Sequence, residues 1–127
     1  MAASEPLTIW YNTLCPVCTA GITWQKRLLV PALKAGHVRF ENINDHPDAL
    51  GRFDAALEDI RKRLHATTGE DALLIGGDVV IAVMRMTPGQ RWLAPIIGNP
   101  VMRPVTNFVY DRIADLLYAW NRRKGHW

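Results

Sequence analysis

Trp10-Tyr11-Asn12-Thr13-Leu14-Cys15-Pro16-Val17-Cys18 is a stretch in which one kind of secondary structure gives way to another. The apolar run 7–11 is typical of a strand that is buried on both faces. A short polar turn follows it, and two cysteines separated by two residues then stand where a helical pattern begins. The junction predicts a dithiol at the N-terminus of a helix.

The position of each cysteine in this helix predicts its chemistry. If Cys15 caps the helix or lies in its first turn, unpaired backbone N–H groups and the helix dipole favour the thiolate. Cys18 lies on the same side of the helix, close enough to form a disulfide but more shielded. Pro16 suits the first helical position, because its φ is fixed near the helical value and it has no N–H to leave unpaired. We expect Cys15 to be the nucleophile and Cys18 the resolving thiol.

A cysteine pair of this spacing can also bind a metal or simply pack in the core. The pair could be half of a zinc site, but the chain has no second pair, and no His-x3–5-His partner is formed by its four histidines, His37, His46, His65 and His126. An iron–sulfur cluster would need four thiolates. We therefore expect no metal. Two inert cysteines packed in the core remain an alternative.

Length and composition indicate one globular domain. The 127 residues are 49% hydrophobic and 21% charged, which is enough for a core without disulfide staples. We assign residues 1–127 to a single domain, with 1–6 as a flexible tail and 90–123 as a C-terminal helical extension. The N-terminal residues lack the pattern of a secretory signal, so we expect a cytoplasmic protein, in which a cysteine pair is more often catalytic than structural.

The charge pattern excludes other classes of partner. The net charge is +3, and the basic clusters 61–63 and 122–124 lack the stripe or motif of a nucleic-acid binder. Helix ends explain both clusters, because Lys and Arg are favoured in the last turn. The apolar segment 79–120 is interrupted by prolines and arginines and has no uninterrupted run near the ~20 residues of a membrane span. We expect neither a nucleic-acid partner nor a membrane span.

The periodicity of apolar residues predicts the order of elements. We expect strands at 7–11, 37–42, 64–68 and 72–75, with the last two joined by a turn at 69–71 into an antiparallel hairpin. The first helix should run over 15–30 and end at Pro31, and the second over 47–60. Strand, helix and strand in this order predict a right-handed crossover between parallel strands.

Three further helices are expected in the second half. Asp78 is a plausible N-cap for a helix that stops before Pro88, and a short helix should cover 90–97. The last helix begins near Arg103 and carries a regular apolar stripe: Val105, Phe108, Val109, Ile113, Leu116, Leu117 and Trp120. We expect this stripe to cover one face of the sheet or to form a dimer interface.

The chain as a whole resembles the DCC family of predicted thiol-disulfide oxidoreductases. The resemblance is carried by the Cys pair after the first strand and by several later landmarks: Leu64-His65, Gly77-Asp78, the run 88–93, Arg103-Pro104, Tyr110 and Asn121-Arg122. It implies a thioredoxin-like α/β fold, with a central mixed four-stranded sheet flanked by helices and a C-terminal helical extension. It also implies dithiol exchange at Cys15 and Cys18 with a disulfide-containing substrate, most naturally a protein.

The sequence departs from that family at two places. Asn12-Thr13 stands where the family has Asp-Gly, and Asn12 can hold geometry by hydrogen bonds but cannot act as a base at neutral pH. Thioredoxins and glutaredoxins place a cis-proline opposite the Cys pair, whereas no proline lies between Pro47 and Pro88 here.

Further candidate residues have two interpretations each. His65 could stabilise the Cys15 thiolate or shuttle a proton, or it could be a partly exposed strand residue. The turn 76–78 resembles the glycine pair of glutaredoxins, where a helix N-terminus receives a glutathione carboxylate, so Gly77 and Asp78 are candidate glutathione or substrate ligands together with Thr13 and Leu14. A turn with a helix cap explains the same residues without a ligand.

These observations favour a thiol-disulfide oxidoreductase that uses the Cys-Pro-Val-Cys dithiol. The alternatives are a glutathione-coupled reductase of the glutaredoxin kind, or a non-catalytic module whose last helix binds a partner while the cysteines only pack. We expect no bound cofactor, glutathione as a candidate reductant, and a monomer or homodimer.

Overall fold

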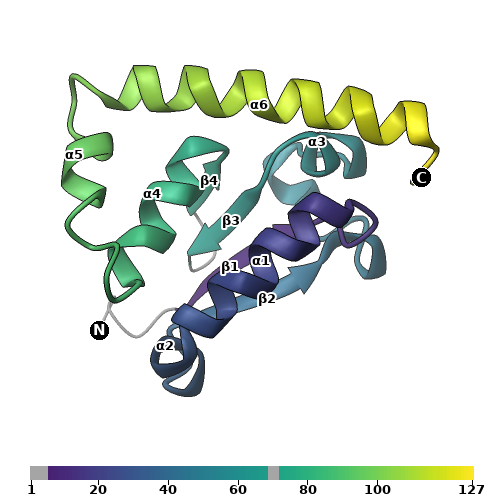
Figure 1. Ribbon diagram of the computed structural model, residues 1–127. Coiled ribbons are helices and arrows are strands. Elements are labelled where there is room, and N and C mark those ends of the chain that lie inside the picture. Colours follow the sequence, from purple (N-terminus) through teal and green to yellow (C-terminus); the bar gives the residue numbers. More distant parts are fainter. Residues whose placement is uncertain (1–5, 69–71) are drawn as a thin grey trace.

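A mixed four-stranded sheet of order β2-β1-β3-β4 forms the centre of the computed structural model, which describes residues 6–68 and 72–127 (Figure 1). The strands are β1 (Leu7–Tyr11), β2 (Val38–Asn42), β3 (His65–Thr68) and β4 (Ala72–Ile75). β2 runs parallel to β1, β3 is antiparallel to β1, and β4 is antiparallel to β3. The thioredoxin-like fold and its hairpin are confirmed. Residues 1–5 of the tail expected over 1–6, and the turn expected at 69–71, lie outside the described residues.

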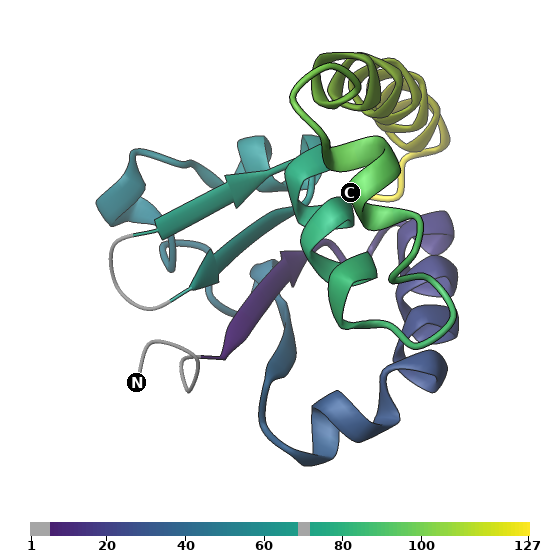
Figure 2. The same ribbon diagram turned by 90° about the vertical axis from the view of Figure 1, so that its left-hand side faces the viewer.

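The main core lies on one face of this sheet. Side chains of alternate strand residues point to the same face, so Leu7 and Ile9 of β1 pack beside Ala66 of β3. They meet Leu29, the C-cap of α1 (Pro16–Leu28), and Val79 of α4 (Gly77–Met86). Both helices lie on this side of the sheet together with α6 (Arg103–Lys124) (Figure 2). A second cluster, formed around three residues of the segment 43–62, packs against Trp10: Ile43, Leu50 and Ile60.

The first helix is shorter than predicted. α1 covers Pro16–Leu28, and a separate short helix α2 covers Val30–Lys34. Pro31 lies in the first turn of α2 and does not end α1, so the prediction of one helix over 15–30 was wrong. The reason is that proline is tolerated in the first turn, where its missing N–H has no intrahelical partner.

The helix expected over 47–60 is absent from the described residues. The segment instead contains the 3-10 turn η3 (Gly51–Phe53) and the start of the short helix α3 (Leu57–Lys62), and it follows the 3-10 turn η2 (Ile43–Asp45). Asp54 adopts a left-handed conformation with φ 59°, which a continuous helix cannot contain. The apolar spacing still identified Leu50 and Ile60 as buried residues, although it gave the wrong backbone.

The turn before α4 (Gly77–Met86) also differs from the prediction. Gly76 is the N-cap, with φ 63°, and Asp78 lies inside the first turn. Asp78 therefore does not cap the helix; its carboxylate instead forms a bidentate pair with Arg103, at 2.8 and 2.7 Å. The short helix predicted over 90–97 is confirmed only in part, as α5 (Ala94–Gly98).

The last helix, α6 (Arg103–Lys124), runs along one side of the molecule from α5 to α3 (Figure 1). Its apolar stripe does not cover the sheet: Phe108 is 64% exposed and Leu116 is 74% exposed. The face that contacts α3 and α4 instead carries residues at spacings of three or four: Asn107, Tyr110, Ala114, Tyr118 and Asn121. The predicted covering of the sheet was wrong, because α6 is attached by hydrogen bonds and aromatic rings and not by its most apolar face.

Hydrogen bonds and ion pairs fix α6 along its length. The Tyr110 hydroxyl accepts from the backbone N–H of Leu64 at 2.9 Å, directly before β3. Arg63 pairs with Asp111 and Asp115, each at 2.8 Å, and the Tyr118 hydroxyl donates to Glu58 of α3. The position of α6 is therefore determined by polar contacts to the residues that lead into the sheet.

We predict that Gly77→Ala lowers the free energy of unfolding by about 1–3 kcal/mol, through overpacking against α6. A Cβ atom at Gly77 would lie against the Asn107 amide oxygen and 3.2 Å from the Asn107 Cα atom, so backbone would have to move. Gly21→Ala is the matched control, because a Cβ there meets nothing within 4 Å. Urea unfolding should show the control equal to or more stable than the parent protein. Equal stability of both variants would contradict the close packing of α6.

Candidate functional site

The cysteine pair lies at the N-terminus of α1, as predicted. Cys15 is the N-cap residue, and its sulfur accepts the backbone N–H of Cys18 at 3.2 Å. Pro16 occupies the start of the helix. Both cysteines are free thiols in this structure. The local sequence builds this geometry because an N-cap side chain normally accepts the N–H of the second or third residue after it.

The exposure of the two cysteines is opposite to the prediction. Cys15 is 1% exposed, whereas Cys18 is only half-buried and lines a cavity. The expectation that Cys18 would be the more shielded thiol was therefore wrong. The physical reason is α6: the buried amide of Asn121 lies over Cys15 and donates an N–H to its sulfur at 3.2 Å.

The Asn121 amide is itself held by the end of the chain. His126 Nδ1 lies 2.6 Å from Asn121 Oδ1, and because an amide oxygen only accepts, that nitrogen carries the proton of the bond. The His126 ring also stands edge-to-face against Trp120, with centroids 5.1 Å apart. With Oδ1 occupied, the amide must present its N–H to the sulfur. The sequence named Asn121 only as a landmark of a resemblance; its spacing from Asn107 and Tyr110 on one face of α6 is the signal that could have found it.

Hydrogen bonds lower the pKa of the Cys15 thiol to about 6. The largest cause is a bond from the Cys18 thiol, and the backbone N–H groups of Cys18 and Val17 and the Asn121 amide act in the same direction, against the effect of burial. The pKa of Cys18 is raised above its usual range, because its proton is bonded to the Cys15 sulfur and because it is partly buried. One thiolate and one thiol therefore share the site at neutral pH.

Asn12 organises the loop before α1. It is buried, and its Oδ1 accepts from the backbone N–H of Leu14 at 3.0 Å and from Asn44 Nδ2 at 2.7 Å. The Thr13 N–H donates to Asn42 at 3.4 Å, and Leu14 is exposed beside the dithiol. The Nδ2 group of Asn12 has no acceptor among the described residues. Asn12 thus holds geometry by hydrogen bonds, as expected, and keeps one donor unused.

His65 lies in β3 and is buried, so the expectation of a partly exposed residue was wrong. Its Nδ1 lies 3.0 Å from the carbonyl oxygen of Arg63, and neither cysteine is among its hydrogen-bond partners in the described structure. Burial lowers the pKa of the His65 ring, which favours the neutral form. The structure does not bring His65 together with the Cys15 thiolate.

The turn proposed for glutathione is covered by α6. Gly77 is buried against Asn107, and the Asp78 carboxylate is bonded to Arg103 and, at 3.4 Å, to Asn107 Nδ2. Arg103 also lowers the pKa of Asp78. Gly77 and Asp78 therefore hold the start of α6, and the geometry offers no reason to place a ligand there.

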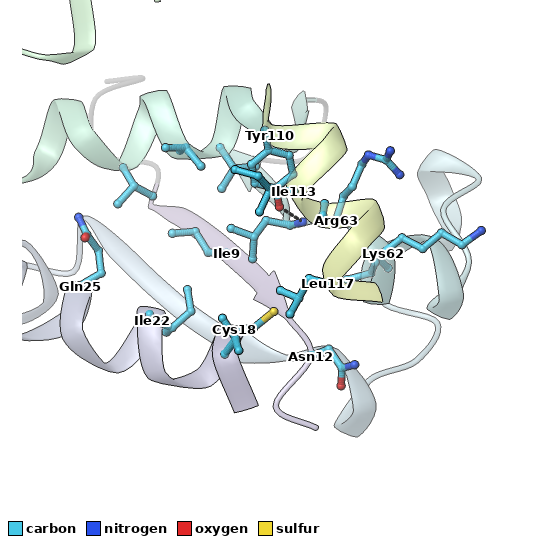
Figure 3. A pocket seen from close by; sticks show the side chains of 18 of the residues that line it. Ile9, Asn12, Cys18, Ile22, Gln25, Lys62, Arg63, Tyr110, Ile113 and Leu117 are labelled. Atoms are coloured by element: carbon cyan, nitrogen blue, oxygen red, sulfur yellow. Dashed lines mark hydrogen bonds between the residues drawn. The ribbon is translucent and has the colours of Figure 1, made fainter. Parts of the chain in front are cut away.

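An apolar cavity of about 290 Å³ adjoins the dithiol. It is bounded by β1, α1, α4 and α6, with Ile9 on the sheet side and Ile22 on α1 (Figure 3). The sulfur of Cys18 points into it, toward Leu117 of α6 (Figure 3). Most of its lining surface is apolar, although polar side chains also reach it, among them Asn12, Gln25 and Lys62. The resolving thiol thus faces an apolar space in the protein.

Within residues 6–68 and 72–127, no three His, Cys, Asp or Glu side chains are grouped so that they could hold a metal ion. In the same residues, no helix has both the length and the apolar character needed to cross a membrane.

Comparison with known proteins gives one match. Neither the curated proteins nor the solved structures include one that matches this chain. The profile of the DCC1-like thiol-disulfide oxidoreductase family matches residues 9–123, which is nearly the whole chain and includes both cysteines, Tyr110 and Asn121. With the thioredoxin-like sheet and the free cysteine pair at the start of α1, this match shows that the chain belongs to the DCC1-like thiol-disulfide oxidoreductase family.

Proposed function

We propose that the protein exchanges its Cys15–Cys18 dithiol with the disulfide of a substrate, and that Cys15 is the nucleophile. The observation that carries the proposal is the set of donors around the Cys15 sulfur, which lowers its pKa to about 6. A thiol with that pKa is mostly thiolate at neutral pH, and the thiolate is the form that attacks disulfides.

The reaction has two balanced steps. The Cys15 thiolate attacks one sulfur of the substrate disulfide, a mixed disulfide forms, and the other substrate sulfur leaves as a thiolate. Cys18 then gives up its proton to solvent and attacks the Cys15 sulfur, and the second substrate thiolate leaves. The substrate gains two electrons, and the protein is left with a Cys15–Cys18 disulfide. The same steps in reverse would oxidise a dithiol substrate.

The second step does not need the carboxylate that Asn12 replaces. The pKa of Cys18 is raised first by the bond of its proton to the Cys15 sulfur, then by burial, and also by the negative charge of that sulfur. In the mixed disulfide Cys15 carries no charge, so the first and the last of these causes disappear and the pKa of Cys18 falls, although burial still raises it. Activation of the resolving thiol follows from the first step.

The substrate must reach a sulfur that is 1% exposed. The Asn121 amide is the group from α6 that contacts this sulfur, and it is attached to His126 near the end of the described chain. We infer that the end of α6 moves away from Cys15 when the substrate sulfur approaches, and that the Asn121 N–H remains a donor to the thiolate until then.

The test is the trapping of the mixed disulfide. Cys18→Ser should attack a substrate disulfide once and keep it bound through Cys15, because no resolving thiol remains, whereas Cys15→Ser should trap nothing. Intact-mass spectrometry after incubation with bis(2-hydroxyethyl) disulfide reads both results. Trapping by Cys15→Ser and not by Cys18→Ser would reverse the two roles, and trapping by neither variant would support the alternative of inert, structural cysteines.

A further inference from the structure

The apolar cavity beside Cys18 is large for a protein interior. Its volume of about 290 Å³ is roughly twice that of an engineered apolar cavity that takes up benzene. Interiors are close-packed, and water gains little in a space with few hydrogen-bonding partners. Such a space is suited to an apolar group that enters from outside.

The apolar surface continues outside the cavity. On α1, Val17 is 53% exposed and Trp24, which is on the same helix face, is 56% exposed. On α6, Ile113 and Leu116 are exposed next to the lining residue Leu117. A small molecule inside the cavity would leave this surface uncovered, whereas a polypeptide could place one side chain inside and rest its neighbours on the surface.

Charge near the cavity favours an acidic partner. The only charged side chains in residues 6–40, which include α1, and in residues 79–110, which include most of α4, are Lys and Arg. The acidic residues on α6 that lie nearest are already paired, because Arg63 binds both Asp111 and Asp115. The segments around the cavity therefore carry more basic than acidic side chains, even though Arg103 is paired with Asp78 and Arg63 is shared by two carboxylates.

We propose that the cavity and the surface around it receive a polypeptide disulfide substrate: an apolar side chain next to the reacting cysteine enters the cavity, and acidic residues follow in the sequence. This rests on the proposed function, because Cys18 lines the cavity and its N–H contacts the Cys15 sulfur that would hold the substrate cysteine. Glutathione has no apolar side chain, so it is a poor substrate under this proposal.

The test uses three peptides that differ only beside their cysteine. Each carries that cysteine as a mixed disulfide with 5-thio-2-nitrobenzoate, whose release by the reduced protein is followed by absorbance. One peptide has Phe and Leu beside the cysteine and Glu further out, the second has Ser in place of Phe and Leu, and the third has Lys in place of Glu. We expect the first to react about tenfold faster than the second, the discrimination that a few apolar contacts give. The first peptide should also react faster than the third, and this difference in rate should become smaller at high salt.

Gly21 offers a matched pair of variants. It lines the cavity, and a Cβ there meets nothing within 4 Å, so a larger side chain can enter the opening without a clash. Gly21→Phe should reduce the preference for the apolar peptide to less than twofold, and Gly21→Ala should retain it. The rate of each variant with bis(2-hydroxyethyl) disulfide is measured in parallel, and because the preference is a ratio of two peptide rates, a general loss of dithiol reactivity cancels.

The other outcomes separate the two proposals. Equal rates for the apolar and serine peptides would overturn the substrate assignment and leave dithiol exchange standing, whereas no reaction with any disulfide would overturn both. An aromatic disulfide without a peptide that reacts as fast as the apolar peptide would assign the cavity to a small molecule instead. If the parent protein sediments as a dimer and Gly21→Phe sediments as a monomer, the cavity would be assigned to a second copy of the chain.

Discussion

Replacing Asn121 by alanine is expected to raise the pKa of the Cys15 thiol by about one to two units. A hydrogen bond to a charged group contributes about 1.5–3 kcal/mol, and one pKa unit corresponds to 1.36 kcal/mol. The amide donates to the sulfur at 3.2 Å in a buried position, where its loss cannot be fully replaced by water. From a pKa of about 6, the thiolate fraction at pH 7 would fall from about nine-tenths to half or less. The pH dependence of Cys15 alkylation in the reduced protein measures this directly.

Two further variants make that experiment specific. Asn121→Asp should raise the pKa further than Asn121→Ala, because a carboxylate near the sulfur repels the thiolate. Arg123→Ala, on the exposed side of the same helix, should leave the pKa within a few tenths of a unit. An unchanged pKa in Asn121→Ala would mean that the amide only fills space beside Cys15.

The reduced protein should become more stable as the pH rises from about 6 to about 9. The pKa of Cys15 falls from its ordinary value of 9.0 to about 6 on folding, so the unfolded chain binds more protons across this range and stability increases with pH. At 1.36 kcal/mol per unit the gain is up to about 4 kcal/mol, complete near pH 9 and absent below pH 6. Above pH 9 the trend should reverse, because Cys18 keeps its proton in the folded state and loses it in the unfolded one.

Urea unfolding with excess reductant, at intervals from pH 5.5 to 9.5, is the measurement. The comparison is Cys15→Ala, in which this dependence should disappear. Burial lowers the pKa of His65 and adds its own pH dependence below about 6.5, but that contribution is common to both proteins and cancels in their difference. Parallel curves for the two proteins would contradict a stabilised thiolate at Cys15.

The local sequence was sufficient for the strands and for the start of α1. Alternation and β-branched residues predicted all four strands to within one residue, and Cys15 and Pro16 predicted the helix start, because these signals depend on residues near each other in the chain. The prediction of a helix over 47–60 was wrong, because the backbone of that region depends on tertiary packing and not on local sequence alone. Its apolar spacing was helical, but Asp54 is left-handed, and Leu50 and Ile60 pack with Ile43 without a continuous helix between them.

The two cysteines of the candidate site were predicted from the sequence, but the residues that cover them were not. Both cysteines were identified, but their relative exposure depends on Asn121, a residue 106 positions from Cys15. No periodicity in the sequence could show that α6 would turn its polar face inward, because hydrophobic patterns assign the apolar face to the core. That assumption also led to the expectation that Phe108 and Leu116 would be covered, whereas both are exposed.

Because Asn121 follows Cys15 by 106 positions, the two residues are synthesised at different times. A ribosome adds roughly 5–20 residues per second, so the cysteines precede the amide that covers them by roughly 5–20 s during synthesis. In that interval Cys15 lacks one of its donors and lacks its cover, and it would titrate closer to an ordinary thiol. A nascent or shortened chain that ends before Asn121 would therefore carry the full Cys-Pro-Val-Cys motif and yet be a weaker nucleophile at neutral pH.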